Sequence, residues 1–101
     1  MKISDIVKRR PEMSKSTILV VDDNTENLKV LSQILMTEKY NVNIATSGSK
    51  AIDSINYEKP NLILMDICMP EMDGYMTVKK IHSMRDLEEI PVIFVSALDS
   101  P

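Results

Sequence analysis

Four short apolar runs recur along the chain. Three of them are apolar at every position, at 18–21 (ILVV), 62–65 (LILM) and 92–95 (VIFV). Continuous runs of this length are typical of strands that are buried on both faces of a parallel sheet. The remaining run, the second in chain order, lies at 42–45 (VNIA) and alternates between apolar and polar residues, which predicts an edge strand.

Three segments with helical periodicity separate these runs. Their apolar stripes are Leu28, Leu31 and Leu35, widened by Val30 and Ile34; Ala51, Ile52 and Ile55; and Tyr75, Val78 and Ile81. Asn24 or Thr25 is a candidate N-cap for the first helix, and the turn residues Asp73 and Gly74 precede the third. The resulting order, βαβαβαβ, predicts a doubly wound α/β fold with right-handed crossovers.

Residues 1–16 differ in charge from the rest of the chain. They carry five Lys/Arg against two acids, a net charge of +3, whereas residues 17–101 carry seven against thirteen, a net charge of −6. A chain of 101 residues has room for one small domain, so we expect a basic tail or linker at 1–16 and a domain at 17–101. An acidic domain disfavours direct nucleic-acid binding, because DNA affinity comes largely from cations that neutralise phosphates.

The sequence also bears on the compartment. The single cysteine, Cys68, excludes an internal disulfide and a multi-cysteine zinc site. No apolar run approaches the ~20 residues that a membrane-spanning helix needs, and the N-terminus has no uninterrupted apolar stretch of secretory type. We therefore expect a cytoplasmic protein that does not contact the membrane.

Acidic residues directly follow two of the predicted strands. Asp22 and Asp23 come after the first apolar run, and Asp66 comes after the third. In open α/β sheets the ligand site lies beyond the carboxyl ends of the strands, where the strand order reverses. If these two strands are neighbours, the three carboxylates converge, and a hard divalent cation such as Mg²⁺ would relieve their repulsion. A carboxylate is also a competent nucleophile toward phosphorus, giving an aspartyl-phosphate.

Ser96 follows the fourth apolar run as Asp66 follows the third. It would stand on the same rim of the sheet, where a hydroxyl can donate to a phosphoryl oxygen. Taken alone, a serine after a strand is usually a turn residue, and Asp22 or Asp23 could simply favour the next helix N-terminus through its dipole. The pattern alone leaves both the metal–nucleophile interpretation and the structural one open.

Three segments together resemble the receiver domain of two-component response regulators: ILVVDDN at 18–24, LMDICMPEMDG at 64–74 and PVIFVSA at 91–97. The resemblance runs from about Thr17 to Pro101 and implies a flavodoxin-like doubly wound parallel sheet.

The resemblance also implies roles for individual residues. Asp66 corresponds to the phosphoacceptor, Asp23 to a direct ligand of Mg²⁺ (or Mn²⁺), and Asp22 to a ligand that acts mainly through water. The main-chain carbonyl of Cys68 would complete the protein ligands. Ser96 corresponds to the switch hydroxyl that closes on the phosphoryl group.

The function that the resemblance implies is a phosphoacceptor in a two-component or phosphorelay system, which takes a phosphoryl group from a sensor histidine kinase or phosphotransfer protein onto Asp66. This role is regulatory rather than enzymatic, although such a domain can catalyse its own phosphorylation and dephosphorylation. An Asp-nucleophile phosphatase is disfavoured, because Cys68 stands where such enzymes want a second acid to protonate the leaving group.

The sequence also departs from the family pattern. A complete receiver continues through another helix, a fifth strand that opens with a phosphoryl-pairing lysine, and a final helix, whereas this sequence stops at Pro101. We therefore expect a sheet that lacks the last strand and the last two helices, and impaired phosphorylation. We also expect an exposed edge at 92–95 that favours self-association. The alternative function is a truncated or degenerate receiver that acts as a phosphorylation-independent interaction module.

Several nearby residues have simple structural interpretations. Asp73 is expected to cap the third helix rather than to bind metal, and Gly74 to supply permissive backbone at a turn. His82 is expected at the surface, and the acidic surroundings of Cys68 disfavour a reactive thiolate. The methionines of this region are expected to pack, namely Met69, Met72 and Met76.

Overall fold

The computed structural model describes residues 16–67, 69, 73–84 and 86–95. The elements are β1 (Thr17–Val21), α2 (Thr25–Thr37), β2 (Asn41–Ala45), α3 (Gly48–Tyr57), β3 (Leu62–Asp66), α4 (Gly74–His82) and β4 (Val92–Val95). The predicted βαβαβαβ order is therefore confirmed. The predicted tail lies almost wholly outside the described residues, so the domain boundary at 16/17 stays a prediction.

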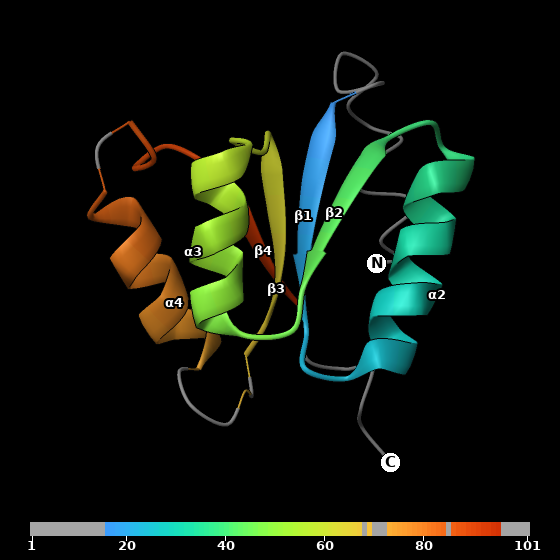
Figure 1. Cartoon of the computed structure of the whole chain (residues 1–101), viewed down its shortest axis with the longest axis horizontal. Helices are drawn as coiled ribbons and strands as arrows, with labels where there is room; N and C mark the ends of the chain where they lie inside the picture. Colours follow the sequence, from blue (N-terminus) through green and yellow to red (C-terminus); the bar gives the residue numbers. More distant parts are fainter. Residues whose placement is uncertain (1–15, 68, 70–72, 85, 96–101) are drawn as a thin grey trace.

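The strands of the described part form one sheet in the order β2-β1-β3-β4, and each neighbouring pair is parallel. The prediction that 42–45 forms an edge strand is confirmed. The chain leaves β1 for β2 on one side and then crosses to β3 on the other, so the strand order reverses between β1 and β3. The carboxyl ends of these two strands point toward the bottom of the view in Figure 1.

Each face of the sheet has its own apolar core, because successive side chains of a strand point to opposite faces. Leu19 and Val21 of β1 join the core with α3 and α4, whereas Ile18 and Val20 join the core with α2. Figure 1 shows α2 on one side of the sheet and α3 and α4 on the other. Because helices cover both faces, β1 and β3 are buried along their whole length, as their continuous apolar sequences predict.

Polar side chains fix where the first two described helices begin. Oδ1 of Asn24 accepts hydrogen bonds from the backbone N–H groups of Glu26 (2.9 Å) and Asn27 (3.2 Å). Oγ of Ser47 accepts one from the N–H of Lys50 at 3.1 Å. These bonds satisfy N–H groups that have no partner inside the helix. Asn24 is therefore the N-cap of α2, as predicted, which places this helix directly after the acidic pair.

The predicted apolar stripes are correct in part. Leu28, Leu31 and Leu35 are buried on α2, but Val30, predicted to widen the stripe, is 50% exposed. On α4 the prediction is wrong for Tyr75, which is 57% exposed.

Strand β4 is less buried than its sequence predicts. Three of its residues are half-buried and Phe94 is 37% exposed. In the described part of the chain β4 pairs with β3 and ends the sheet. A strand with a neighbour on one side keeps its other edge accessible, which accounts for the exposure.

Candidate functional site

The register of β1 and β3 brings the predicted acids together. Val21 of β1 lies opposite Met65 of β3. Asp22 and Asp66, the residues that follow this pair, therefore stand side by side at the point where the strand order reverses. The first and third strands are therefore neighbours, which was the condition for convergence of the three carboxylates.

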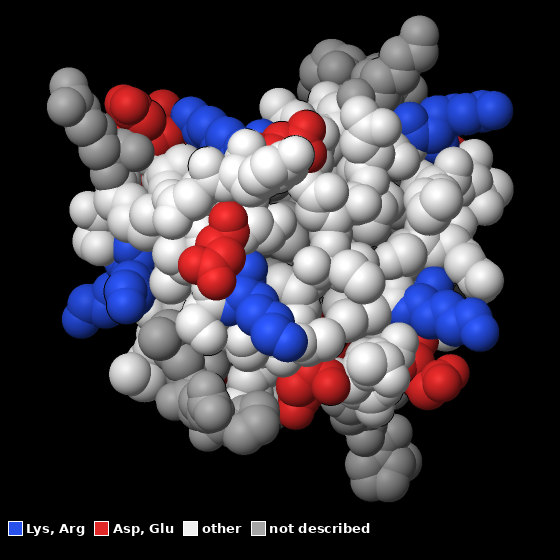
Figure 2. Space-filling model, viewed as in Figure 1, with Lys and Arg blue, Asp and Glu red and all other residues white. Residues whose placement is uncertain are grey.

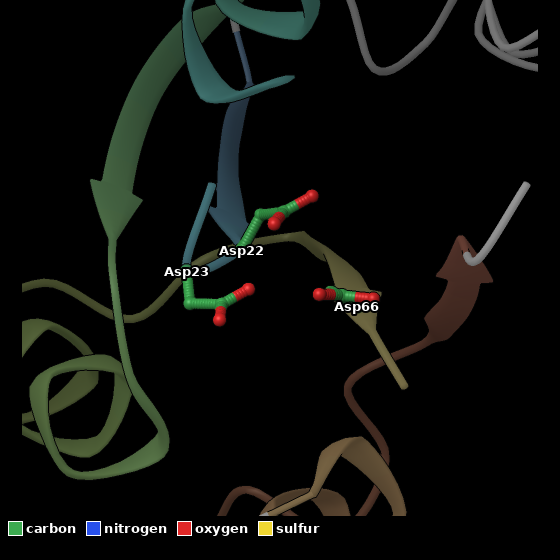
Figure 3. A group of neighbouring side chains, drawn as sticks. All are labelled: Asp22, Asp23 and Asp66. Atoms are coloured by element: carbon green, nitrogen blue, oxygen red, sulfur yellow. The ribbon is translucent and has the colours of Figure 1, made fainter. Parts of the chain in front are cut away.

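Three carboxylates surround one small space here, as Figure 3 shows. One oxygen from each of Asp22, Asp23 and Asp66 lies within 4.8 Å of the others. Asp22 and Asp66 are buried, with 3% and 4% of their surface exposed, whereas Asp23 is exposed. Burying negative charge beside negative charge is unfavourable unless a cation compensates it. Asp23 is therefore the member of the described cluster that meets solvent.

Asp22 is held in place by the start of α2. Its Oδ1 accepts a hydrogen bond from the backbone N–H of Asn24 at 2.9 Å, and its Oδ2 accepts one from the Nδ2 group of Asn27 at 3.2 Å. Its own N–H donates to the carbonyl oxygen of Ala45 at 3.1 Å. Asn27 was not predicted as a site residue. Its place in the first turn of the helix that Asn24 caps puts it near Asp22 in sequence but does not fix the direction of its side chain.

The donor set fits a hard divalent cation. Mg²⁺ prefers oxygen ligands in an octahedron, whose neighbouring positions lie roughly 3 Å apart. Small side-chain movements would bring oxygens that already lie within 4.8 Å of one another to such spacing. No sulfur or imidazole ligand belongs to this cluster among the described residues, and this also suits Mg²⁺ rather than Zn²⁺.

Two predicted site residues, Cys68 and Ser96, lie outside the described residues. In the β3–β4 register Val95 lies opposite Asp66. Ser96 therefore follows, in sequence, the strand residue opposite the predicted phosphoacceptor. The role of the Cys68 carbonyl as a ligand and that of Ser96 as a switch hydroxyl stay predictions.

Asp73 caps α4, as predicted. Its Oδ1 accepts a hydrogen bond from the backbone N–H of Met76 at 2.8 Å. It does not belong to the acidic cluster of Asp22, Asp23 and Asp66. Its prediction as a helix cap is confirmed.

His82 ties the end of α4 to the segment before β4. The ring is half-buried rather than at the surface as predicted. Its Nε2 lies 3.0 Å from the carbonyl oxygen of Ile90, to which a ring N–H donates.

The methionines of this region were predicted to pack. Met69 is buried as predicted, whereas the prediction is wrong for Met76, which is 59% exposed. Met72 lies outside the described residues.

A groove of about 650 Å³ lies at the opposite end of the strands. It is lined by the α3–β3 and α4–β4 connections, including Asn61 and Pro91, and not by the three acids. Ligands of open α/β sheets bind at the carboxyl ends of the strands. The groove is therefore not the functional site that this fold predicts.

The distribution of charge on the surface bears on the partners that the chain could bind. On the face shown in Figure 2, blue basic and red acidic side chains are interspersed. Among the described residues, no helix is both long and apolar enough to cross a membrane. The predicted absence of nucleic-acid binding and the predicted cytoplasmic location stay predictions.

Comparison with known proteins identifies the family. The family model of the response regulator receiver domain matches residues 18–101. The two-component response regulator ORR3 of rice (Oryza sativa subsp. indica) is 35% identical over 85 residues, which make up 83% of this chain and 65% of that protein. The chain therefore belongs to the response regulator receiver domain family, the phosphoacceptor domains of two-component signalling. It spans less than two thirds of the length of the rice protein.

Solved structures agree with this assignment. The N-terminal domain of a response regulator receiver protein from Methanoculleus marisnigri matches with a TM-score of 0.79 and 35% identity, over 81% of this chain and 67% of that one. The receiver domain of the sensor histidine kinase PA1611 from Pseudomonas aeruginosa matches with a TM-score of 0.76 and 30% identity, over 84% and 71%. The latter has a magnesium ion coordinated in its active-site cleft. The flavodoxin-like fold predicted from the sequence is thereby confirmed.

Proposed function

We propose that Asp66 is the residue of this receiver domain that accepts the phosphoryl group. The observation that carries the proposal is the convergence of Asp22, Asp23 and Asp66, with one oxygen from each within 4.8 Å, at the point where the strand order reverses. Asp66 is the member of this group that ends the central strand β3.

The transfer needs an ionised Asp66 carboxylate. One of its oxygens attacks phosphorus, a P–O bond forms, and the bond between phosphorus and the donor breaks with its electron pair leaving on the donor. For a phosphohistidine donor, the leaving group is the imidazole, which takes up a proton. The product is an acyl phosphate at the end of β3.

Asp22, Asp23 and Asp66 are the residues that would hold Mg²⁺ (or Mn²⁺). When bound, the ion neutralises negative charge on the carboxylates and on the incoming phosphoryl group. Asn24 and Asn27 orient the Asp22 carboxylate toward this space through the hydrogen bonds described above. Two further roles belong to the same proposal. The Cys68 carbonyl would be an additional ligand, and the Ser96 switch hydroxyl would donate a hydrogen bond to a phosphoryl oxygen.

The proposed role is regulatory, and it includes catalysis by the domain of its own phosphorylation and dephosphorylation. The proposed phosphoryl source is a sensor histidine kinase or a phosphotransfer protein. The receiver-domain neighbour from P. aeruginosa belongs to a sensor histidine kinase, which supports this class of partner. A second copy of the chain, paired along β4, is a further proposed partner, supported by the exposure of Phe94 at the end of the described sheet.

The assignment of Asp66 is tested by labelling with a small phosphodonor such as acetyl phosphate, read as the mass of one added phosphoryl group. Asp66→Asn should remove the label. Asp53→Asn, which changes an exposed acid on α3, should keep it. An Asp66→Asn variant that is folded and still labelled would refute the proposal.

A further inference from the structure

The first residue of α4 lies directly against the end of β3. The backbone N–H of Gly74 donates to the carbonyl oxygen of Ile67 at 2.8 Å. A Cβ atom at Gly74 would overlap the carbonyl oxygen of Asp66 and would come within 2.9 Å of the Cα of Ile67 and 3.0 Å of the Cγ of Met65. Two of these three neighbours are backbone atoms, which cannot rotate away.

The requirement for glycine at position 74 is therefore one of space. Among the described residues no glycine has a positive φ. The sequence led us to expect that Gly74 provides a backbone conformation that other residues rarely adopt in a turn. This reason for the glycine was wrong. What the glycine allows is a close approach between the helix and the residue that carries the proposed nucleophile.

The next residue of α4 contacts the neighbouring strand. The ring of Tyr75 packs on the ring of Phe94 in β4, with 4.6 Å between centroids and an interplanar angle of 43°. In the β3–β4 register, Val95, the residue after Phe94, lies opposite Asp66. Consecutive residues of one helical turn thus contact the ends of two adjacent strands.

The helix start is fixed against sliding. Asp73 caps α4 through its side chain, and its carbonyl oxygen accepts a hydrogen bond from Oγ1 of Thr77 at 2.9 Å. Thr77 is fully buried. These contacts fix the residue at which the helix begins. They therefore also fix which residues of its first turn lie against β3 and β4, namely Gly74 and Tyr75.

We infer that the first turn of α4 braces the carboxyl ends of β3 and β4, with Gly74 and Tyr75 as positioning residues for Asp66. The inference rests on the proposed function of Asp66 and adds two residues that contribute no side chain to the acidic cluster. Gly74 sets the backbone of Asp66 relative to Asp22 and Asp23. Tyr75, through Phe94, sets the end of β4 relative to Asp66.

A side chain at position 74 would disturb the site in a defined way. To restore an ordinary contact of about 3.5 Å, the two backbones must part by on the order of 1 Å. Displacements of about 1 Å at a reacting group cost up to about a hundredfold in rate. We therefore expect Gly74→Ala to weaken Mg²⁺ binding about tenfold or more and to move the amide resonances of Asp66 and Ile67 even without metal.

Gly48→Ala is the matched control. Gly48 is the other glycine of the sequence, and it is likewise buried and the first residue of a helix, but that helix is α3, which follows the edge strand β2. It should leave Mg²⁺ affinity within about twofold of the wild type. The proposed role of Gly74 is wrong if Gly74→Ala is folded, keeps the wild-type Mg²⁺ affinity and leaves both amide resonances in place. In that case Gly74 does not position Asp66.

Tyr75 gives a second test, which does not depend on how well Gly74→Ala folds. Tyr75→Ala should slow labelling of Asp66 several-fold while leaving Mg²⁺ affinity unchanged, because Tyr75 acts on β4 and not on the acidic cluster. Tyr75→Phe keeps the ring contact and should restore the rate, and Tyr57→Ala, at a residue 94% exposed, should have no effect. Equal labelling rates for Tyr75→Ala and the wild type would refute the proposed role of Tyr75.

These outcomes separate the brace from the function on which it rests. If the wild type binds no Mg²⁺ and Asp66→Asn labels as the wild type does, the proposed function fails. In the other outcome, the wild type binds Mg²⁺ and is labelled at Asp66, while substitutions at positions 74 and 75 change neither the Mg²⁺ affinity nor the labelling rate. In that case only the proposed roles of Gly74 and Tyr75 fail. The metal-free amide resonances of Asp66 and Ile67 test the Gly74 contact in both cases.

Discussion

The Nδ2 group of Asn27 donates a hydrogen bond of 3.2 Å to Oδ2 of Asp22, so the first turn of α2 orients one carboxylate of the acidic cluster. Asp22 is 3% exposed, and a buried carboxylate depends on its hydrogen-bond donors for both its charge and its direction. Asn27 therefore belongs to the site although it does not belong to the cluster itself.

We predict that Asn27→Ala weakens Mg²⁺ binding by roughly tenfold, the lower end of the effect of residues that orient metal ligands. The change removes one of the donors to Asp22 and leaves the carboxylate less firmly oriented, with the hydrogen bond from the Asn24 N–H still in place. The affinity can be measured by titration of amide resonances near Asp66. Asn56→Ala, at an exposed position of α3, is the control. Equal affinities for both variants would show that Asn27 does not orient Asp22.

Much of this site follows from the sequence because its acids end the predicted strands. Continuous apolar runs predict strands that are buried on both faces, and the residue after each run then stands at the carboxyl end of the sheet. Asp22 and Asp66 were found in this way. Asn27 could not be, because its contact with Asp22 depends on how α2 turns back over the end of β1, and periodicity does not determine this.

The errors on the helices have a physical reason in each case. At 3.6 residues per turn, Val30 lies about 200° around α2 from Leu28 and so faces solvent despite its apolar side chain. On α4 the buried face contains Gly74, Thr77 and Ile81. Two of these, Gly74 and Thr77, are not large apolar residues. A prediction from hydrophobicity alone therefore placed Tyr75 on the buried face instead. With Gly74, Thr77 and Ile81 on the buried face of α4, Tyr75 is left 57% exposed.

We predict that Mg²⁺ stabilises the folded chain through the acidic cluster. At a free concentration a hundredfold above Kd, a ligand that binds only the folded state adds about 2.7 kcal/mol. Thermal unfolding with and without Mg²⁺ should show this gain in the wild type, and a chelator should reverse it. Asp66→Asn should lose most of the gain, whereas Asp53→Asn should keep it. An equal rise in Tm for both variants would place the Mg²⁺ elsewhere.

We predict a sharp contrast between two adjacent residues of α2. Leu35 is fully buried in the core between α2 and the sheet, whereas Met36 is 62% exposed. Leu35→Ala should lower the free energy of unfolding by about 2–5 kcal/mol through lost burial and the cavity that remains. Met36→Ala should change it by no more than about 0.5 kcal/mol. Denaturant unfolding of both variants checks the rotation of the helix, and similar losses would show that it is wrong.

We predict that the chain self-associates along β4. In the described part of the chain this strand pairs with β3 and ends the sheet, and its sequence, Val92–Val95, has no charge to prevent pairing with a second strand. Phe94, the most exposed residue of the strand, is the position to change.

Phe94→Lys should shift the chain toward monomer, because a charged side chain on an edge strand opposes pairing with another strand. Tyr57→Lys introduces the same charge at a position 94% exposed on α3 and should leave self-association unchanged. Sedimentation velocity over a range of concentrations measures both effects. The wild type should sediment faster as its concentration rises. A wild-type chain that stays monomeric at high concentration, with slow amide exchange along 92–95, would mean that this edge is satisfied within one molecule.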